Sequence, residues 1–299
     1  MNTVILKDTK QFSRLYSFIL PFFFVVLYGS GFVGAKYGLP FSSPLSFLSL
    51  RFLIAGLILF AVVKAMKVKL PSLLKSIQIA ISGSFTVALF SIGVFVSIDM
   101  GLSPSLSALI IALQPILVAT FAKSFIGEQL TFVQWAGLAL GLLGVVLVVG
   151  HNIDLDSGAL GLASVAMSIL GLLGLTIGSL YQKKYCSDMN IYVGGMIQSL
   201  VSGLICIGLL PFYGGYSVEW SPEFIGALLF MSIGVSIGAL SLLYLMISAG
   251  DVSKVASVFY LVPVSAAIPA YFFFGETFDI FTLSGACVVA LGVFLTNRR

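Results

Sequence analysis

Apolar runs of about 20 residues recur from one end of this chain to the other, and they restrict its fold more than any other feature, because about 20 apolar residues in a helix span the hydrocarbon core of a bilayer. Strands of a membrane barrel alternate polar and apolar residues, and these runs do not alternate. Only 9% of the 299 residues are charged, whereas a soluble domain carries about 25%. The sequence therefore predicts an all-α membrane protein.

Ten such runs follow one another, and they predict ten transmembrane helices. The expected spans are 16–37, 44–63, 76–98, 103–124, 131–150, 158–180, 190–210, 222–248, 252–274 and 278–296. The first run is longer than the apolar core of a signal peptide, which has roughly 7–15 residues. Because further spans follow it, we expect it to be retained as the first helix.

The second half of the chain repeats part of the first half at a fixed offset. Pro115 and Pro263 are 148 residues apart (263 − 115), and the segments 108–148 and 256–296 align at this offset without a gap. The residues of the first segment that meet identical partners are Ala108, Leu113, Ala119, Ala122, Phe125, Gly127, Glu128, Gly137, Leu143, Gly144, Val145 and Leu147. A long repeat of this kind defines the architectural unit.

The repeat predicts two domains, 1–150 and 151–299, with five helices each. Since five is an odd number, the second repeat enters the membrane with the opposite polarity. Glu128 is then expected at the cytoplasmic face and its twin, Glu276, at the outer face. Two inverted repeats are the architecture of many secondary transporters, in which the related halves exchange conformations and open one site to either side in turn.

The distribution of Lys and Arg supports this topology independently. If the N-terminus lies in the cytoplasm, 13 of the 15 Lys and Arg residues fall on the cytoplasmic side. Lys36 lies at the outer side, and Arg51 lies within the second span. We expect a multi-pass protein of the cell inner membrane with both termini in the cytoplasm.

Several other functional classes find no support in the sequence. The chain has no Walker-type Gly-Lys-Ser/Thr loop, and residues 29–34 match the dinucleotide pattern G-x-G-x-x-G only inside an apolar span. The single histidine, His151, falls in a predicted outer loop, which argues against an intramembrane serine-histidine enzyme. The three cysteines are scattered and predict no metal site. We expect no cofactor, no metal and no nucleic acid; the expected partners are a small-molecule substrate and the lipid bilayer, and the expected state is a monomer or homodimer.

The segment 250–276, GDVSKVASVFYLVPVSAAIPAYFFFGE, resembles a characteristic stretch of the ten-helix EamA-type exporters of the drug/metabolite transporter superfamily. It matches the turn between helices eight and nine, the proline of helix nine and the closing Gly-Glu of that family. Segment 108–128 follows the same pattern for helix four.

Two shorter motifs add to this resemblance. Residues 28–33, YGSGFV, followed by Lys36, are similar to the first-helix motif of the family, which more often has tryptophan where Tyr28 stands. Arg51-Phe52 resembles the Arg-Phe of its second helix. The resemblance covers essentially the whole chain and implies a transporter of small metabolites; amino acids, nucleotide derivatives, amines, vitamins and drugs are all substrates within the family.

Arg51 is the sharpest single candidate, because a charge inside a span costs at least ~2.5 kcal/mol and usually faces a cavity or a partner. One interpretation is a ligand for a substrate carboxylate or phosphate. The other is structural, with the guanidinium bonded to carbonyls or reaching toward the interface. The sequence leaves both interpretations open.

The resemblance places the substrate cavity between helices one, three, four, six, eight and nine. Besides Arg51, the candidate wall residues from these spans are Tyr28, Ser30, Phe90, Phe95, Gln114, Thr176, Ser236, Tyr244 and Tyr260. Aromatic walls with a few polar groups are typical of ligand sites. With 26 Phe in the chain, packing or lipid contact is the alternative for each aromatic.

Pro115 and Pro263 lie in the middle of their spans. Each proline lacks an N–H and should kink its helix. As repeat twins they are candidates for paired hinges, and two static kinks are the alternative.

Together these features predict a secondary transporter that works by alternating access, most simply an exporter of amino acids or similar amphipathic metabolites. The alternatives are uptake or exchange of a nucleotide-like or amine metabolite and, from another class, an intramembrane enzyme or a non-transporting scaffold.

Overall fold

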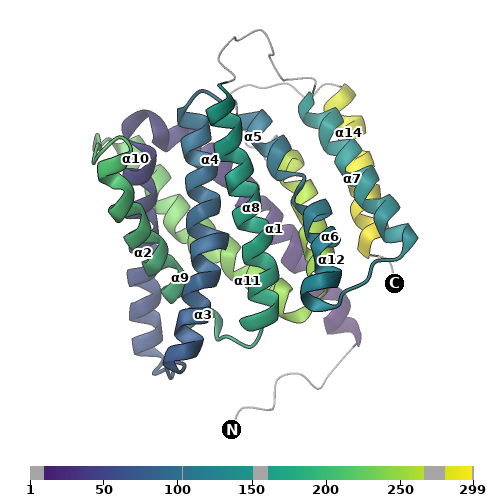
Figure 1. The fold of residues 1–299 in the computed structure, drawn as a ribbon, viewed down its shortest axis with the longest axis horizontal. Coiled ribbons are helices and arrows are strands. Elements are labelled where there is room, and N and C mark those ends of the chain that lie inside the picture. Colours follow the sequence, from purple (N-terminus) through teal and green to yellow (C-terminus); the bar gives the residue numbers. More distant parts are fainter. Residues whose placement is uncertain (1–9, 103, 151–160, 266–279, 298–299) are drawn as a thin grey trace.

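The computed structural model describes residues 10–102, 104–150, 161–265 and 280–297. Their regular structure is helical (Figure 1), apart from an isolated antiparallel bridge between Ser42 and Val218. The elements are α1 (Lys10–Gly38), η1 (Leu39–Phe41), α2 (Pro44–Ala65), α3 (Leu73–Gly83), η2 (Ser84–Leu89), α4 (Phe90–Asp99), α5 (Pro104–Ile111), α6 (Gln114–Ile126), α7 (Phe132–Gly150), α8 (Leu162–Tyr185), α9 (Ile191–Leu209), η3 (Leu210–Phe212), α10 (Pro222–Leu229), η4 (Phe230–Ala239), α11 (Leu240–Ala249), α12 (Val252–Ser257), η5 (Val258–Tyr260) and α14 (Ile280–Asn297).

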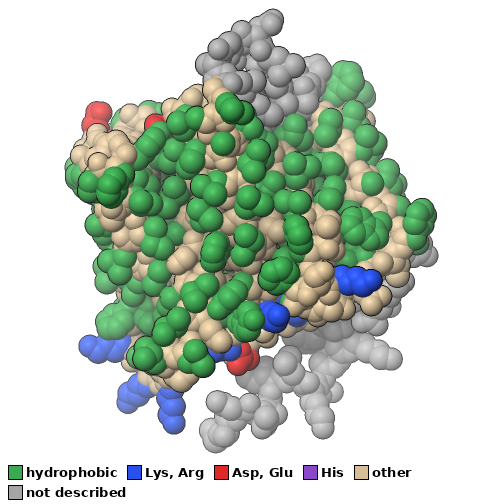
Figure 2. All heavy atoms as spheres, in the orientation of Figure 1, with side chains coloured by type: hydrophobic (Ala, Val, Ile, Leu, Met, Phe, Trp, Pro, Cys, Tyr) green, Lys and Arg blue, Asp and Glu red, His purple; other side chains and the backbone are tan. Residues whose placement is uncertain are grey.

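Many of these helices are long and apolar enough to cross a membrane. Within the described residues six qualify: Pro44–Ala65, Leu73–Asp99, Ser107–Ile126, Leu162–Tyr185, Ile191–Phe212 and Pro222–Ala249. Four shorter apolar helices are Ile19–Gly31, Phe132–Leu147, Val252–Ser265 and Leu283–Asn297. Hydrophobic side chains cover the sides of the bundle (Figure 2). The chain is therefore an all-α membrane protein, as the sequence predicted, although the rest of the expected ninth span, beyond 265, lies outside the described residues.

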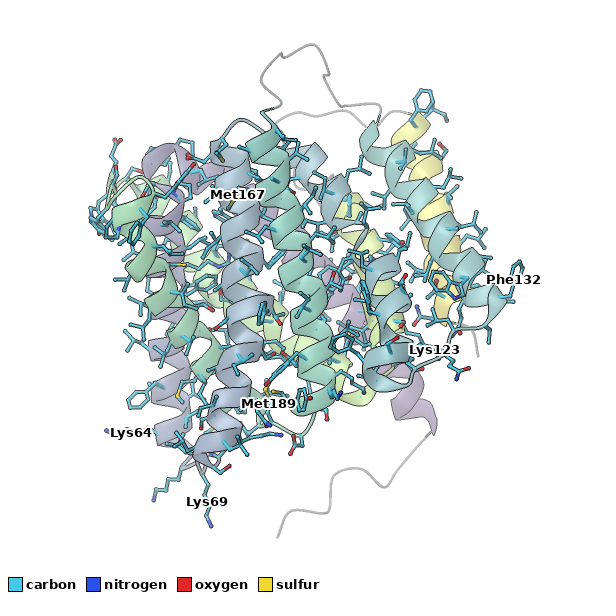
Figure 3. All side chains as sticks on the ribbon, viewed as in Figure 1. Lys64, Lys69, Lys123, Phe132, Met167 and Met189 are labelled. Carbon is cyan, nitrogen blue, oxygen red and sulfur yellow. The ribbon has the colours of Figure 1, made fainter. Side chains whose placement is uncertain are left out.

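Lysines gather at one end of the bundle (Figures 2 and 3), which we call the lysine-rich end. Its lysines are Lys64, Lys67, Lys69, Lys75, Lys123, Lys183, Lys184 and Lys254. The opposite end holds the acidic residues Asp99, Glu219 and Glu223. The lysine-rich end also holds Glu128, Asp188 and Asp251, so it is the gathering of lysines at one end that agrees with the asymmetry expected from the sequence.

Local sequence sets where helices begin and end. Pro44 starts α2, where its missing N–H has no intrahelical partner to lose. The side chain of Ser43 accepts the N–H of Ser46 at 3.4 Å and caps the same helix. At its other end, α6 stops at Gly127, whose φ of 74° lies in the left-handed region that glycine adopts at little cost.

Two helices become π-helical in their middle. η2 separates α3 from α4, and η4 separates α10 from α11. The two segments are repeat twins: Ser84 and Ser232 are 148 residues apart (232 − 84), and so are Val87 and Val235 (235 − 87). π-helical turns are rare and concentrate at functional sites. Their recurrence at equivalent positions of the two repeats therefore indicates a functional site near η2 and η4.

The helices that contain Pro115 and Pro263 are also interrupted at equivalent positions. α5 ends at Ile111 and α6 begins at Gln114. In the second repeat the 3-10 segment η5 ends three residues before Pro263. Each proline lacks the N–H that would bond to the carbonyl four residues earlier. The regular pattern of α-helical hydrogen bonds is therefore broken just before each proline.

Glycines bring the backbones of α7 and α14 into direct contact along one side of the bundle (Figure 1). A Cβ added to Gly292 would lie 2.4 Å from the backbone N of Gly141, and one added to Gly144 would lie 2.6 Å from that of Val289. Small residues at such contacts allow the close packing that drives helix association in lipid. These two helices form a seam that any larger side chain would force apart.

Substituting Gly292→Ala should therefore destabilise the protein, because a methyl group cannot fit between the two backbones; overpacking of this kind costs about 1–3 kcal/mol. Gly208→Ala is the matched control, since a Cβ there meets nothing within 4 Å. Thermal unfolding in detergent measures the difference. A melting temperature for Gly292→Ala equal to that of Gly208→Ala would contradict the seam.

Candidate functional site

A cavity lies between α1, α2, α4 and the two π-helical segments. Four residues that the sequence singled out line it together: Tyr28, Arg51, Phe90 and Phe95. The other lining residues include Ala35, Thr86, Val87, Ser91, Ile98, Met231 and Val235. Its empty space, including the part open to solvent, is about 540 Å³. Its walls are apolar and aromatic with a few polar groups, which is the usual composition of a small-molecule site.

Arg51 is the charged residue of this cavity. It lies in the third turn of α2 and is only 5% exposed. Its Nε donates a hydrogen bond to the Ser236 hydroxyl at 2.7 Å, and its guanidinium carbon lies 5.0 Å from the centroid of the Phe52 ring. No acidic side chain among the described residues pairs with it. A buried cation normally pairs with an anion, so the guanidinium is available to an anionic group in the cavity.

Two groups of packed aromatic rings contribute to the cavity wall, which we call the aromatic wall. The Tyr28 ring stacks on Phe90 with centroids 6.2 Å apart and meets Phe259 edge-on at 5.3 Å. Phe95 stacks on Phe47 at 5.7 Å. Such paired rings are worth about 0.5–1.5 kcal/mol each beyond the area they bury, so the wall is a packed surface.

The structure places the remaining candidates away from this cavity, except for Ser236, which holds Arg51. The Ser30 and Thr176 hydroxyls donate to carbonyls of their own helices, at 2.6 and 2.8 Å. Gln114 is buried beside the break between α5 and α6. Tyr260 fills the notch left by Gly141 of α7. Tyr244 is buried and lines a second, smaller pocket nearer the lysine-rich end.

The sequence prediction missed several residues of η2, η4 and α4 that line the cavity. Thr86 and Ser91 line it from the first repeat, and Val87 faces it together with its twin Val235. In a chain with so many apolar residues, none of these stands out alone. The identity of Val87 and Val235 at the repeat offset was the available signal, because twin residues on the axis between two halves meet at a shared site.

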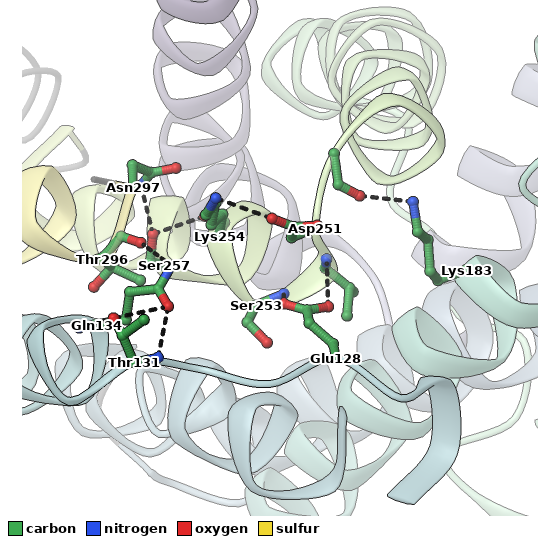
Figure 4. Close-up of polar contacts among 12 residues, drawn as sticks. Glu128, Thr131, Gln134, Lys183, Asp251, Ser253, Lys254, Ser257, Thr296 and Asn297 are labelled. Atoms are coloured by element: carbon green, nitrogen blue, oxygen red, sulfur yellow. Dashed lines mark hydrogen bonds and ion pairs between the residues drawn. The ribbon is translucent and has the colours of Figure 1, made fainter. Parts of the chain in front are cut away.

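At the lysine-rich end, side chains from α8 and from the loop after α6 hold the turn between α11 and α12 (Figure 4). The Glu128 carboxylate accepts the backbone N–H groups of Val252 and Ser253, both at 3.1 Å. The Lys183 ammonium donates to the carbonyls of Ile247 at 2.9 Å and Gly250 at 2.7 Å. Glu128 therefore caps a helix of the other repeat; its twin, Glu276, lies outside the described residues.

A third bridge joins α3 to the end of α8 at the same face. Lys75 pairs with Asp188 and donates to the carbonyl of Tyr185 at 2.7 Å. The hydrogen bond from Lys75 lowers the pKa of the Asp188 carboxyl below its usual range. The bridge is thus present at neutral pH and is lost as the pH falls through that lowered value. With the turn contacts of Glu128 and Lys183, it closes the bundle at this end.

Residues 15–150 and 162–298 each match the EamA-like transporter family. The chain belongs to that family. This confirms the resemblance to EamA-type members of the drug/metabolite transporter superfamily, and it makes the protein a membrane transporter rather than an enzyme.

Proteins similar to this EamA-family chain carry transporter names. An uncharacterized transporter of Bacillus subtilis, YvbV, is 24% identical over 299 residues, covering 97% of this chain and 94% of that protein. A probable amino-acid metabolite efflux pump of Salmonella typhimurium is 25% identical over 287 residues, covering 91% of each. A solved crystal structure matches with a TM-score of 0.77 at 17% identity, covering 93% of this chain and 95% of the other; at that identity it shows the fold alone.

Proposed function

We propose that this transporter works by alternating access between two inverted five-helix repeats, 1–150 and 151–299. The six long and four shorter apolar helices support ten spans. The twin positions of the π-helical segments and of the proline breaks support two halves built on one plan. By the positive-inside rule, the lysine-rich end and both termini face the cytoplasm, and the protein lies in the cell inner membrane.

The observation that carries the proposal is the position of Arg51. Its guanidinium is buried in a cavity between elements of both repeats, held through Nε by Ser236, with no acidic partner among the described residues. A carboxylate of the substrate supplies the missing charge and accepts the free N–H groups, since guanidinium and carboxylate match in a bidentate geometry. The aromatic wall then receives the apolar part of the substrate.

The present conformation corresponds to a state open toward the outer side. The cavity reaches Ile98, next to the end of α4, and Ala35, near the end of α1. Both ends lie opposite the lysine-rich end, which Glu128, Lys183 and Lys75 close. Transport then requires that closure to open while the outer side closes.

A small amphipathic metabolite with a carboxylate, such as an amino acid, fits this site, and export is the proposed direction. The name of the Salmonella relative, a probable amino-acid metabolite efflux pump, supports that substrate class. A phosphate would also bind the guanidinium, so uptake or exchange of a nucleotide-like solute is the second candidate.

Arg51→Ala should weaken substrate binding roughly 10- to 100-fold and slow transport accordingly, because the hydrogen bonds of a charged group are worth about 1.5–3 kcal/mol. Arg51→Lys keeps the charge but loses the bidentate geometry and should retain part of the activity. Counterflow of labelled amino acids in proteoliposomes measures this. Full activity in Arg51→Ala would contradict the role of Arg51, and the absence of counterflow with pooled metabolites in the unchanged protein would contradict the proposed function.

Pro115→Ala and Pro263→Ala should each slow turnover several-fold, because alanine restores an N–H that can bond to the carbonyl four residues earlier and stiffen the break. Substrate binding should change little. Turnover and binding are measured on the same purified variants. If both variants turn over at the original rate, the two breaks are static kinks and not hinges.

A further inference from the structure

A column of polar side chains continues from the cavity toward the lysine-rich end, inside a bundle that is otherwise apolar. It begins at Thr86, which lines the cavity. One helical turn further, the Ser82 hydroxyl donates to Oε1 of Gln182 at 3.1 Å, and Nε2 of Gln198 donates to the same oxygen at 3.2 Å. Gln182 in turn lines the smaller pocket, together with Tyr244. The column thus joins the two pockets.

Close backbone contact keeps this column continuous. A Cβ on Gly178 would lie 2.1 Å from the Thr86 hydroxyl, so α8 and η2 touch at the top of the column. Gln182 follows Gly178 by one turn of α8, as Ser82 precedes Thr86 by one turn on α3. On facing sides of α8 and the α3–η2 helix, Gly178 therefore lies beside Thr86, and one turn nearer the smaller pocket Gln182 lies beside Ser82.

The column contains polar atoms that the protein leaves without a partner. The Thr86 hydroxyl, Oε1 of Gln198 and the Tyr244 hydroxyl are all buried and make no hydrogen bond to another described residue. Thr86, Gln198 and Tyr244 are 1%, 0% and 3% exposed. Each buried polar atom without a partner costs about 1–3 kcal/mol, and helices in lipid tolerate polar groups mainly where they face a cavity or a water-filled path. Gln114, Ser253 and Tyr260 hold such atoms elsewhere among the described residues; what distinguishes the column is that Thr86 lines the cavity and Tyr244 lines the smaller pocket.

Two of the contacts at the lysine-rich end join helices that carry this column. Lys75 bridges α3 to the end of α8, and Lys183 bridges α8 to the end of α11. These helices supply Ser82, Gln182 and Tyr244 to the column. Release of the contacts would separate the helices whose polar faces now meet.

We propose that this column is the cytoplasmic half of the solute path, and that Gln182, Gln198 and Tyr244 bind the solute during its passage. The proposal rests on the proposed function, which it extends from the Arg51 cavity to the other membrane face. The column carries amides and hydroxyls and no charged side chain, so it binds hydrogen-bonding groups of the solute as neutral partners. The atoms without partners are an amide oxygen, which accepts hydrogen bonds, and two hydroxyls, which both accept and donate. The solute class is therefore one that combines an anionic group, held by Arg51, with N–H or O–H donors.

Cysteine accessibility tests the column without any knowledge of the substrate. In a background with Cys186, Cys206 and Cys287 replaced by Ser, Ser82→Cys reports on the column. Ser168→Cys is the matched control, because Ser168 is equally buried, lies on α8 and bonds to Ser107 at 3.0 Å, outside the column. The probe is an anionic, membrane-impermeant methanethiosulfonate reagent added to inside-out vesicles. Lys183→Ala, which removes the bridge between α8 and the end of α11, is combined with each reporter.

We expect the reagent to modify Ser82→Cys and Lys183→Ala to accelerate that reaction at least ten-fold, while Ser168→Cys stays unmodified in both backgrounds. No modification of Ser82→Cys, no acceleration, or equal modification of both reporters would overturn the proposal. If Ser82→Cys does not fold, Ser202→Cys replaces it, since the Ser202 hydroxyl donates to the Gly83 carbonyl beside the column at 3.4 Å. Because the assay needs no transport, accessible cysteines without counterflow would instead contradict the proposed function.

Discussion

In the hydrocarbon core of a membrane each backbone N–H and C=O must find its partner inside the protein, and this constraint organises the whole structure. A regular α-helix meets it within a single segment. This chain departs from the regular α-helix at η2 and η4 and at the breaks before Pro115 and Pro263, and both pairs are repeat twins. Irregular backbone at membrane depth is tolerated where it is buried in protein or lines a cavity. The π-helical pair meets that condition, because both of its segments line the cavity that holds Arg51.

One part of the bundle is tightly packed, and in another part some buried polar groups lack hydrogen-bond partners. Along α7 and α14, glycine contacts such as that of Gly292 with Gly141 leave no space between the backbones. Between α3, α8, α9 and α11, by contrast, buried amides and hydroxyls such as Gln198 and Tyr244 keep unused hydrogen-bonding capacity. The proposed alternating access requires helices that separate as well as helices that stay together. We assign these two roles to the two kinds of contact.

The sequence predicted the helices well, because apolar run length is a direct consequence of membrane thickness. It also predicted the interruptions at Pro115 and Pro263, since the loss of an N–H is a local property. It brought Tyr28 and Arg51 to one cavity because charge and polarity inside a span are rare and informative.

What the sequence could not show is which face of each helix points inward. A span that is apolar on all sides carries no amphipathic pattern, so Thr176 and Tyr260 were as plausible as Thr86 for the cavity wall, and the structure places them elsewhere. The π-helical segments depend on close tertiary contact, such as that between Gly178 and Thr86. Likewise, Glu128 finds its partners at Val252 and Ser253, far away in sequence.

The central claim is that one cavity between the repeats opens to each membrane face in turn. Its most direct test is a single cysteine at Ser91, which lines that cavity, in a cysteine-free protein, exposed to an impermeant thiol reagent in right-side-out and in inside-out vesicles. Alternating access gives modification from both faces, and a saturating solute that occupies the cavity should slow both reactions. Modification in only one of the two vesicle orientations would show that the cavity opens to one face alone, and it would contradict the account.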